Sequence, residues 1–181
     1  MNNAPLSPLE QASAKAPEAD RTHSCTVVGL GLRALAHPAA LQALWQQAQA
    51  DLQGQTATAH FCAVAVLDTK TDHTALATWL AEFAGKTPSI PVLAVPAARL
   101  AEQAVPTQSP RLRARYGSGS VAEAAALSAA GPQAQLIVPR IVAADGSATL
   151  AVAIRRAGYP KDCLAAAGRA RAAAPLQGTT A

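Results

Sequence analysis

The stretch Tyr116-Gly117-Ser118-Gly119-Ser120-Val121-Ala122-Glu123-Ala124-Ala125-Ala126-Leu127 joins a turn of glycine and serine directly to a helix of small residues. Ser120 and Glu123 have the spacing of a capping box, in which each side chain accepts a hydrogen bond from a free backbone N–H of the first turn. The free N–H groups and the helix dipole favour a carboxylate or phosphate in front of Ser118, Gly119 and Ser120. An ordinary capped helix explains the same residues, so the surrounding sequence has to decide between the two interpretations.

Apolar strands and amphipathic helices alternate on both sides of this stretch. The pattern predicts strands at 25–28, 59–67, 90–95, 136–138 and 149–154, with a hairpin turn at Asp145-Gly146 before the last strand. It predicts helices at 38–54, 72–85 and 121–130 and a short helix from Pro96, with Asp72 as the cap of the second helix. Residues 105–119 lack periodicity and are predicted to form a long loop. This order predicts a three-layer α/β/α sandwich with a mostly parallel mixed sheet of about five strands.

Composition limits the chain to one domain and a few classes of partner. The chain has 181 residues, half of them hydrophobic, and we expect a domain at 24–156 between a polar tail at 1–23 and an alanine-rich tail at 157–181. Three cysteines without paired spacing, no secretory signal and no apolar run that could span a bilayer predict a cytoplasmic protein without membrane contact. Aromatic residues make up 3% of the chain, which argues against nucleic acid, and a net charge of +4 suits an acidic small molecule.

Ligands of such sheets bind beyond the carboxyl ends of the strands, and polar or glycine-containing clusters follow several predicted strands here. The candidate binding residues are Gly29, Gly31, Arg33, Asp72, Ser109, Ser118, Gly119, Ser120 and Arg140, and Asp68 and Lys70 are the catalytic candidates if the protein is an enzyme. Arg111, Arg113 and Arg115 lie in the loop that leads to Ser118. Arginine and lysine at such positions bind carboxylates, although each cluster also has a purely structural explanation as a turn, a cap or a solvated edge.

Other site types fit less well. Gly29 to Ala34 matches the dinucleotide pattern Gly-x-Gly-x-x-Ala, but the acidic residue expected about twenty positions later would be Asp51, inside a predicted helix. His60 and Cys62 would share one face of a strand, yet no further ligands complete a metal site, so we predict neither metal nor cofactor. Asp68 and His73 could act in acid–base catalysis, but no serine or cysteine lies in a nucleophile elbow.

Four motifs in register resemble the family of CobE and the C-terminal domain of CbiG, proteins of cobalamin (vitamin B12) biosynthesis. The resemblance covers about residues 25–155. It rests on Gly29-Leu30-Gly31 with Arg33, on Asp68-x-Lys70-x-Asp72, on Gly119 to Leu127, and on Leu136 to Arg140 with Thr149 to Ile154. This chain departs from the common pattern of the first loop at Leu32 and Ala34, and it has His73 and Arg140 where relatives often carry an acidic residue and a lysine.

The resemblance implies a precorrin or corrin intermediate as ligand, a tetrapyrrole ring with many carboxylate side chains, held by a carrier or accessory protein. Other enzymes of the cobalamin pathway are the partners it implies. An alternative is a precorrin hydrolase that opens a lactone or removes an acyl group. In that case Asp68 would activate water, and Lys70 with the amides of Ser118 to Ser120 would stabilise the oxyanion. A dinucleotide-binding module remains a lesser alternative.

Overall fold

A five-stranded sheet in the order β3-β2-β1-β5-β4 forms the middle layer of the protein. The computed structural model describes residues 24–53, 60–84 and 90–156, so the predicted tails at 1–23 and 157–181 lie outside the described residues. Along the chain the elements are β1 (Ser24–Leu32), α1 (Pro38–Gln53), β2 (His60–Leu67), the 3-10 helix η1 (Asp68–Lys70), α2 (Thr74–Ala84), β3 (Val92–Val95), α3 (Ala97–Ala101), α4 (Pro110–Tyr116), α5 (Val121–Ala130), β4 (Gln135–Val142) and β5 (Ala148–Arg156).

Strand directions agree with the mostly parallel mixed sheet that the sequence predicts. β1, β2 and β3 are parallel, and β5 is antiparallel to both β1 and β4, so β4 points the same way as β1. The predicted hairpin joins β4 to β5: the Gly146 N–H donates to the Ala143 carbonyl at 2.8 Å, and Gly146 has the positive φ of 66° that favours glycine. The carboxyl ends of β1 to β4 and this hairpin therefore lie at one end of the sheet, which we call the carboxyl edge.

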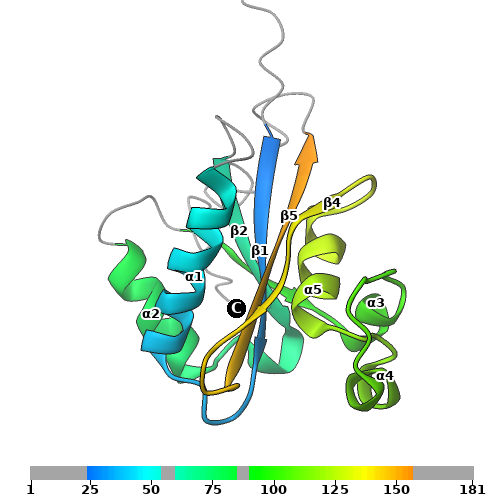
Figure 1. The fold of residues 1–181 in the computed structure, drawn as a ribbon, viewed down its shortest axis with the longest axis horizontal. Helices are drawn as coiled ribbons and strands as arrows, with labels where there is room; N and C mark the ends of the chain where they lie inside the picture. The colour runs from blue at the N-terminus through cyan, green and yellow to red at the C-terminus, as the bar shows by residue number, and fades with distance from the viewer. Residues whose placement is uncertain (1–23, 54–59, 85–89, 157–181) are drawn as a thin grey trace, which may run out of the picture.

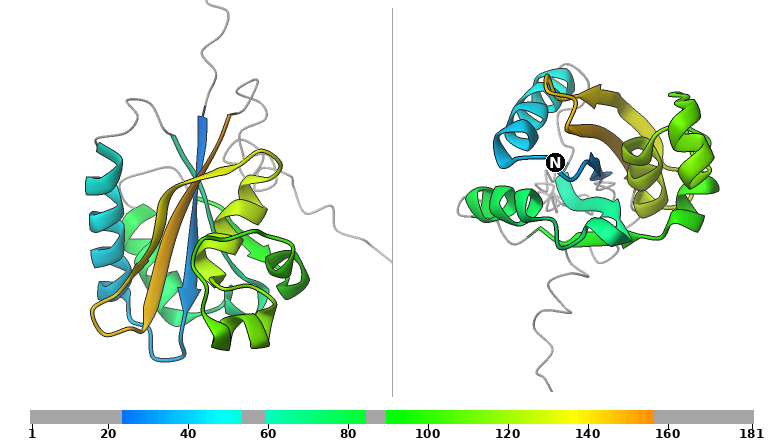
Figure 2. Two further views of the ribbon diagram at one scale, coloured as in Figure 1. Left: turned by 45° about the vertical axis from the view of Figure 1, so that its right-hand side comes forward. Right: turned by 90° about the horizontal axis from the view of Figure 1, so that it is seen from below.

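Helices cover both faces of the sheet, which confirms the three-layer prediction (Figures 1 and 2). α1 and α2 pack on one face around Leu41, Leu44 and Trp79, and α5 with α3 packs on the other. The side of the sheet under α1 and α2 is lined by valine and leucine. The opposite core contains four alanines of α5, so that helix lies close to the strands.

β1 is longer than predicted, and its glycines allow other elements to pack closely against it. β1 does not stop at Gly29 but continues to Leu32, and α5 crosses directly over it. A Cβ at Gly29 would collide with the Ala122 carbonyl and would stand 2.6 Å from the Ala126 nitrogen. A Cβ at Gly31 would collide with the Thr149 hydroxyl. The glycines therefore permit close contact between elements, not a sharp turn after the strand.

The prediction of an uninterrupted loop over 105–119 is wrong, because α4 lies within it. Ser109 caps α4 by accepting the Leu112 N–H at 3.5 Å, Pro110 occupies the first turn, and Gly117 ends the helix with φ 70°. None of the residues of α4 is buried. A helix without a buried face has no apolar stripe, so only its caps could have signalled it.

Candidate functional site

The structure brings the predicted clusters together at the carboxyl edge, the lower end of the sheet in Figure 1. Arg33 follows β1, and η1 follows β2. The segment before α4 lies at the same end, because the Ser109 N–H donates to the Gly119 carbonyl just before α5. Arg140, which we expected just after a strand, lies near the end of the longer strand β4. This agrees with the rule that ligands of open sheets bind beyond the carboxyl ends of the strands.

The turn after β1, residues 33–37, is held on both sides. The Arg33 N–H donates to the Ser147 carbonyl of the hairpin at 2.9 Å, and the Arg33 carbonyl accepts from Ala36 N–H at 3.1 Å. Nε2 of His73, at the start of α2, lies 3.0 Å from the same carbonyl. The side chain of Arg33 is exposed, and its Nη1 lies 3.8 Å from where a Cβ on Gly146 would stand. The main chain is thus fixed while the guanidinium faces solvent.

Asp145 fixes the hairpin beside this turn. Its Oδ1 accepts hydrogen bonds from the Ser147 N–H at 3.0 Å and the Ser147 hydroxyl at 2.8 Å, and its Oδ2 lies 3.0 Å from Nε2 of His37. The backbone and side-chain hydrogen bonds from Ser147, followed by those from His37, lower the pKa of Asp145 below its ordinary value. The sequence identified Asp145 only as a turn residue, and His37 was missed; its position before Pro38, where a helix cap belongs, was the available signal.

The cluster from Asp68 to Asp72 forms the next part of the edge. Oδ1 of Asp68 accepts the Thr69 N–H at 2.6 Å, and the exposed carboxylate thus caps its own turn. Lys70 is half-buried. Asp72 does not cap α2 as predicted: the helix begins at Thr74, and Nδ1 of His73 accepts the Ala75 N–H at 3.2 Å in the role expected for Asp72.

The start of α5 is covered. Ser120 accepts the Glu123 N–H at 3.4 Å, as the capping box predicts, but Ser118 and Ser120 are only 2% and 0% exposed. Gly119 accepts the Ser109 N–H at 3.1 Å, and a Cβ at Gly119 would collide with the Thr107 carbonyl. The segment 107–109 therefore lies over the amides of Ser118 to Ser120, and a ligand at the surface does not reach them directly.

Glu123 makes contacts that correct the second half of the predicted capping box. Its carboxylate does not return to the Ser120 N–H, and the residue is fully buried. Oε1 accepts the Thr107 hydroxyl at 2.8 Å and the Arg140 N–H at 3.0 Å, while Oε2 accepts the Thr107 N–H at 3.2 Å. The Ser120 N–H instead lies 3.5 Å from Oγ of Ser118. Glu123 thus joins α5 to the segment before α4 and to β4.

A bulge in β4 makes the Arg140 contact possible. Val138 pairs with Val152 and Ile141 with Leu150, so Pro139 and Arg140 together oppose one residue of β5. The extra residue frees the Arg140 N–H from the sheet, and Glu123 accepts it. Bulges of this kind redirect side chains and occur often beside functional sites. Arg140 is half-buried at the carboxyl edge.

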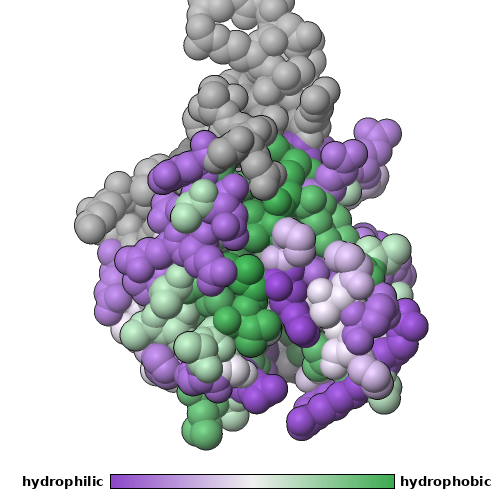
Figure 3. Space-filling view, in the orientation of Figure 1, coloured by the Kyte–Doolittle hydropathy of each residue, from purple (hydrophilic) through white to green (hydrophobic). Residues whose placement is uncertain are grey.

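Positive side chains at this edge lack acidic partners. Among residues 24–53, 60–84 and 90–156, the ion pairs are His37 with Asp145 and Arg99 with Glu102. Arg33, Lys70 and Arg140 belong to neither pair. The three arginines of α4 are exposed, and hydrophilic side chains gather over α3 and α4 in the surface view (Figure 3). The arrangement suits a ligand with several separated negative groups.

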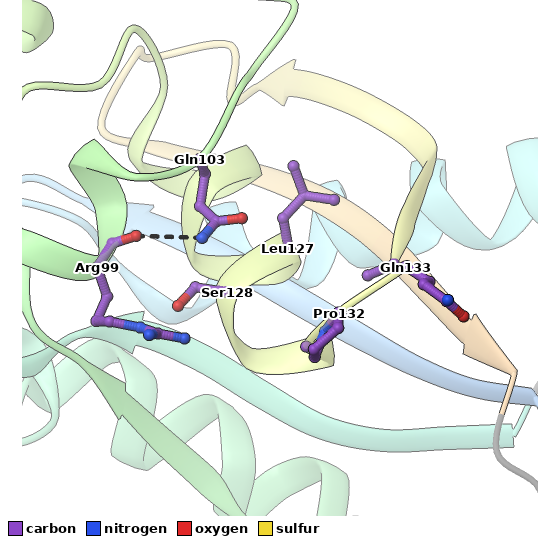
Figure 4. A pocket seen from close by; sticks show the side chains of 8 residues that line it. Arg99, Gln103, Leu127, Ser128, Pro132 and Gln133 are labelled. Carbon is purple, nitrogen blue, oxygen red and sulfur yellow. Dashed lines mark hydrogen bonds between the residues drawn. The ribbon is translucent and has the colours of Figure 1, made fainter.

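A cavity of about 250 Å³ lies elsewhere, beside the C-terminal end of α5 (Figure 4). Its lining comprises Arg99, Gln103, Leu127, Ser128, Gly131, Pro132, Gln133 and Ala134. Arg99 is already paired with Glu102 at 3.4 Å, and Gln103 donates to the Arg99 carbonyl at 3.4 Å. None of the predicted binding residues lines this cavity, and its mixed lining specifies no class of ligand.

Two alternative site types considered from the sequence, a dinucleotide site and a metal site, can be compared with the geometry. The Gly29 to Ala34 pattern lies largely within β1, and α1 begins only at Pro38, so no helix start follows the glycines as a dinucleotide fingerprint requires. In the part of the chain that the structure describes, no group of three or more His, Cys, Asp or Glu side chains could hold a metal ion. Over the same part, no helix has the length and apolar character needed to cross a membrane.

The sequence matches the model of a known protein family. The family model "Cobalamin synthesis G C-terminus" matches residues 26–153, which is more than half of the sequence. The chain belongs to this family. It therefore takes part in cobalamin biosynthesis, as the resemblance in the sequence implies. A comparison with curated proteins finds no significant match.

Solved structures of the same pathway share the fold. CobE, a protein from the cobalamin biosynthetic pathway, is 27% identical with a TM-score of 0.58, over 73% of this chain and 91% of CobE. The cobalamin biosynthesis protein chiG from Agrobacterium tumefaciens str. C58 is 32% identical with a TM-score of 0.50, over 71% of this chain and 96% of chiG. The match thus covers nearly the whole length of both solved proteins.

Proposed function

We propose that this protein binds a precorrin or corrin intermediate through the carboxylates at the ring's periphery and serves as a carrier or accessory protein of the pathway. The observation that carries the proposal is the set of cations at the carboxyl edge, Arg33, Lys70 and Arg140, which have no acidic partner among the described residues. Guanidinium and ammonium groups without an acidic partner, spread along one edge of the sheet, suit a broad ligand whose charges are spread along its rim.

Each cation has its own role in the proposal. Arg33, on the fixed turn after β1, offers a planar fork to one carboxylate. Lys70 on η1 and Arg140 on the bulge of β4 offer single contacts to others. Gly29, Gly31, Ser118, Gly119 and Ser120 support the site by packing under it and do not touch the ring.

The neighbours of these cations have lesser roles. Asp72 is exposed two residues after Lys70 and can accept a hydrogen bond from the ligand, while Ser109 caps the start of α4. α4 then places Arg111, Arg113 and Arg115 at the rim of the site, where they raise the local concentration of an anionic ring without defining its position.

The carrier function is favoured over hydrolysis by the contacts of the residues that hydrolysis would need. Oδ1 of Asp68 accepts the Thr69 N–H at 2.6 Å, so one oxygen of the proposed base is engaged in its own turn. The amides of Ser118 to Ser120, the proposed oxyanion donors, lie behind residues 107–109. An oxyanion hole needs donors that reach the reacting oxygen, and these do not reach the surface.

Two corrins with the same ring and different charge test the proposal. Cobyrinic acid carries free carboxylates, and cobinamide carries amides in their place. We expect saturable binding of cobyrinic acid by absorbance titration and much weaker binding of cobinamide. Arg33→Ala should weaken binding of cobyrinic acid by about tenfold or more, as expected for one charge-assisted hydrogen bond.

Arg99→Ala is the matched control, because it removes the same charge at the distant cavity. Its affinity for cobyrinic acid should stay within about twofold of the unaltered protein. Equal binding of the two corrins, or equal losses for Arg33→Ala and Arg99→Ala, would contradict recognition of carboxylates at this edge.

A further inference from the structure

Two histidines from different helices hold the turn at residues 33–37 from opposite sides. His37 directly precedes α1 and reaches the hairpin, where its Nε2 lies 3.0 Å from Oδ2 of Asp145. His73 directly precedes α2 and reaches back to the turn, where its Nε2 lies 3.0 Å from the Arg33 carbonyl. Each imidazole thus bridges the start of a helix and a neighbouring loop.

The other ring nitrogen of each histidine determines the tautomer. Nδ1 of His37 accepts the Ala40 N–H at 3.2 Å, and Nδ1 of His73 accepts the Ala75 N–H at 3.2 Å. A nitrogen that accepts a hydrogen bond carries no proton, so in both rings the hydrogen is on Nε2. Nε2 of His73 therefore donates to the Arg33 carbonyl, and Nε2 of His37 donates to Asp145. Both rings therefore act as helix caps and as bridges.

We propose that His73 and His37 are positioning residues of the ring site, which keep the turn that carries Arg33 and Leu35 in one conformation. This inference rests on the proposed ring-binding function and assigns neither histidine a contact with the ligand. The turn is also anchored by the Arg33 N–H on Ser147. A binding loop that is already ordered loses less conformational entropy when it binds.

Leu35 gives the fixed turn a second contact. Its side chain is 87% exposed, the highest exposure of any large hydrophobic residue in the described part of the chain. A single exposed leucine needs no explanation on a mobile loop, but here it stands on a turn held by both histidines, two residues from Arg33. A corrin offers an apolar ring face and a charged rim, so Leu35 can contact the face while Arg33 binds a carboxylate.

His73→Asn separates the bridge from the helix cap. Asparagine is a good N-cap and can accept the N–H of the first turn of α2, but its side chain is too short to reach the Arg33 carbonyl. We expect the denaturant midpoint of His73→Asn to equal that of the unaltered protein and its affinity for cobyrinic acid to fall by about tenfold.

A purely structural role for His73 predicts the opposite pattern, with His73→Asn binding cobyrinic acid like the unaltered protein. That result would overturn the inference. His37→Asn, which also keeps a cap, should weaken binding of cobyrinic acid as well.

The test separates this inference from the proposed function. If cobyrinic acid does not bind at all, the proposed function fails and the inference falls with it. If cobyrinic acid binds and His73→Asn matches the unaltered protein, only the inference fails. Nitrogen NMR of the ligand-free protein should report a proton on Nε2 and none on Nδ1 for both rings, and the reverse assignment would contradict the bridge directly.

Discussion

Glu123→Gln tests whether the buried carboxylate of α5 holds the two neighbouring segments in place. The carboxylate accepts three hydrogen bonds: the Thr107 hydroxyl and the Arg140 N–H on Oε1, and the Thr107 N–H on Oε2. Glutamine has nearly the same shape but one oxygen only. If that oxygen keeps the contacts of Oε1, the amide NH₂ faces the Thr107 N–H, donor against donor.

The size of the effect follows from that one unsatisfied donor. A buried N–H without an acceptor costs about 1–3 kcal/mol, so Glu123→Gln should lower the free energy of unfolding by that amount. Glu123→Ala removes the acceptors of three donors and should cost more than about 3 kcal/mol. Such a loss is a large part of the about 5–15 kcal/mol that stabilises a typical domain, so the glutamine variant is the safer test.

Urea unfolding provides the assay, with Thr107→Val as the matched control. Valine removes the hydroxyl but leaves the carboxylate with both backbone donors, so it should cost about 0.5–1.5 kcal/mol, less than Glu123→Gln. The slope of unfolding free energy against urea should not change, since all variants expose the same surface. If Glu123→Gln unfolds at the same urea concentration as the unaltered protein, or if Thr107→Val is the more damaging change, the carboxylate does not have the role described.

Two further substitutions test the packing and the hairpin. Gly29→Ala should destabilise the protein by about 1–3 kcal/mol or more in the same assay, because the new methyl group collides with the main chain of α5, which cannot move as a side chain can. Gly146→Ala is strained only by its positive φ and should cost about 1 kcal/mol. A smaller loss of stability for Gly29→Ala than for Gly146→Ala would argue against the close crossing of α5 over β1. The pKa of Asp145 is lowered chiefly by its bonds to Ser147, so its contribution to stability is present above the ordinary carboxyl pKa and is lost as the pH falls through the lowered value. Asp145→Asn should therefore unfold with less dependence on pH in the acid range, and an unchanged acid dependence would contradict this.

The fold was predictable where its signals are local. The alternation of apolar strands and helices was enough for the three layers, Asp145-Gly146 was enough for the hairpin, and Ser120 with Gly131 bounds α5 correctly. These features depend on backbone preferences within a few residues, which a single sequence carries. The position of the candidate site at the carboxyl edge also followed from strand order alone.

The features that the sequence did not reveal depend on contacts between distant residues. Glu123 has the spacing of a capping residue, but its partners Thr107 and Arg140 lie sixteen and seventeen residues away. α4 has caps but no buried face, and a periodicity argument detects only buried faces. His73 replaces Asp72 as the cap of α2 because the imidazole can also reach the Arg33 carbonyl, forty residues away in sequence.

Three acidic residues accept hydrogen bonds from neutral groups or a histidine instead of pairing with arginine or lysine. Asp68 accepts a backbone N–H, Asp145 accepts donors from Ser147 and His37, and Glu123 accepts donors from Thr107 and Arg140. In the described residues these carboxylates stabilise turns and junctions, and none of them pairs with an arginine or lysine side chain.

Under the proposed function, Arg33 and Arg140 bind the ligand. The main chain of Arg33 is held by the hairpin and by His73, and that of Arg140 by Glu123. Both guanidinium groups nevertheless lack an acidic partner in the regions described, so the backbone is fixed while the charge stays available. A ring with several carboxylates can then bind without first displacing an internal ion pair, and its affinity should fall with added salt, as expected for exposed charges.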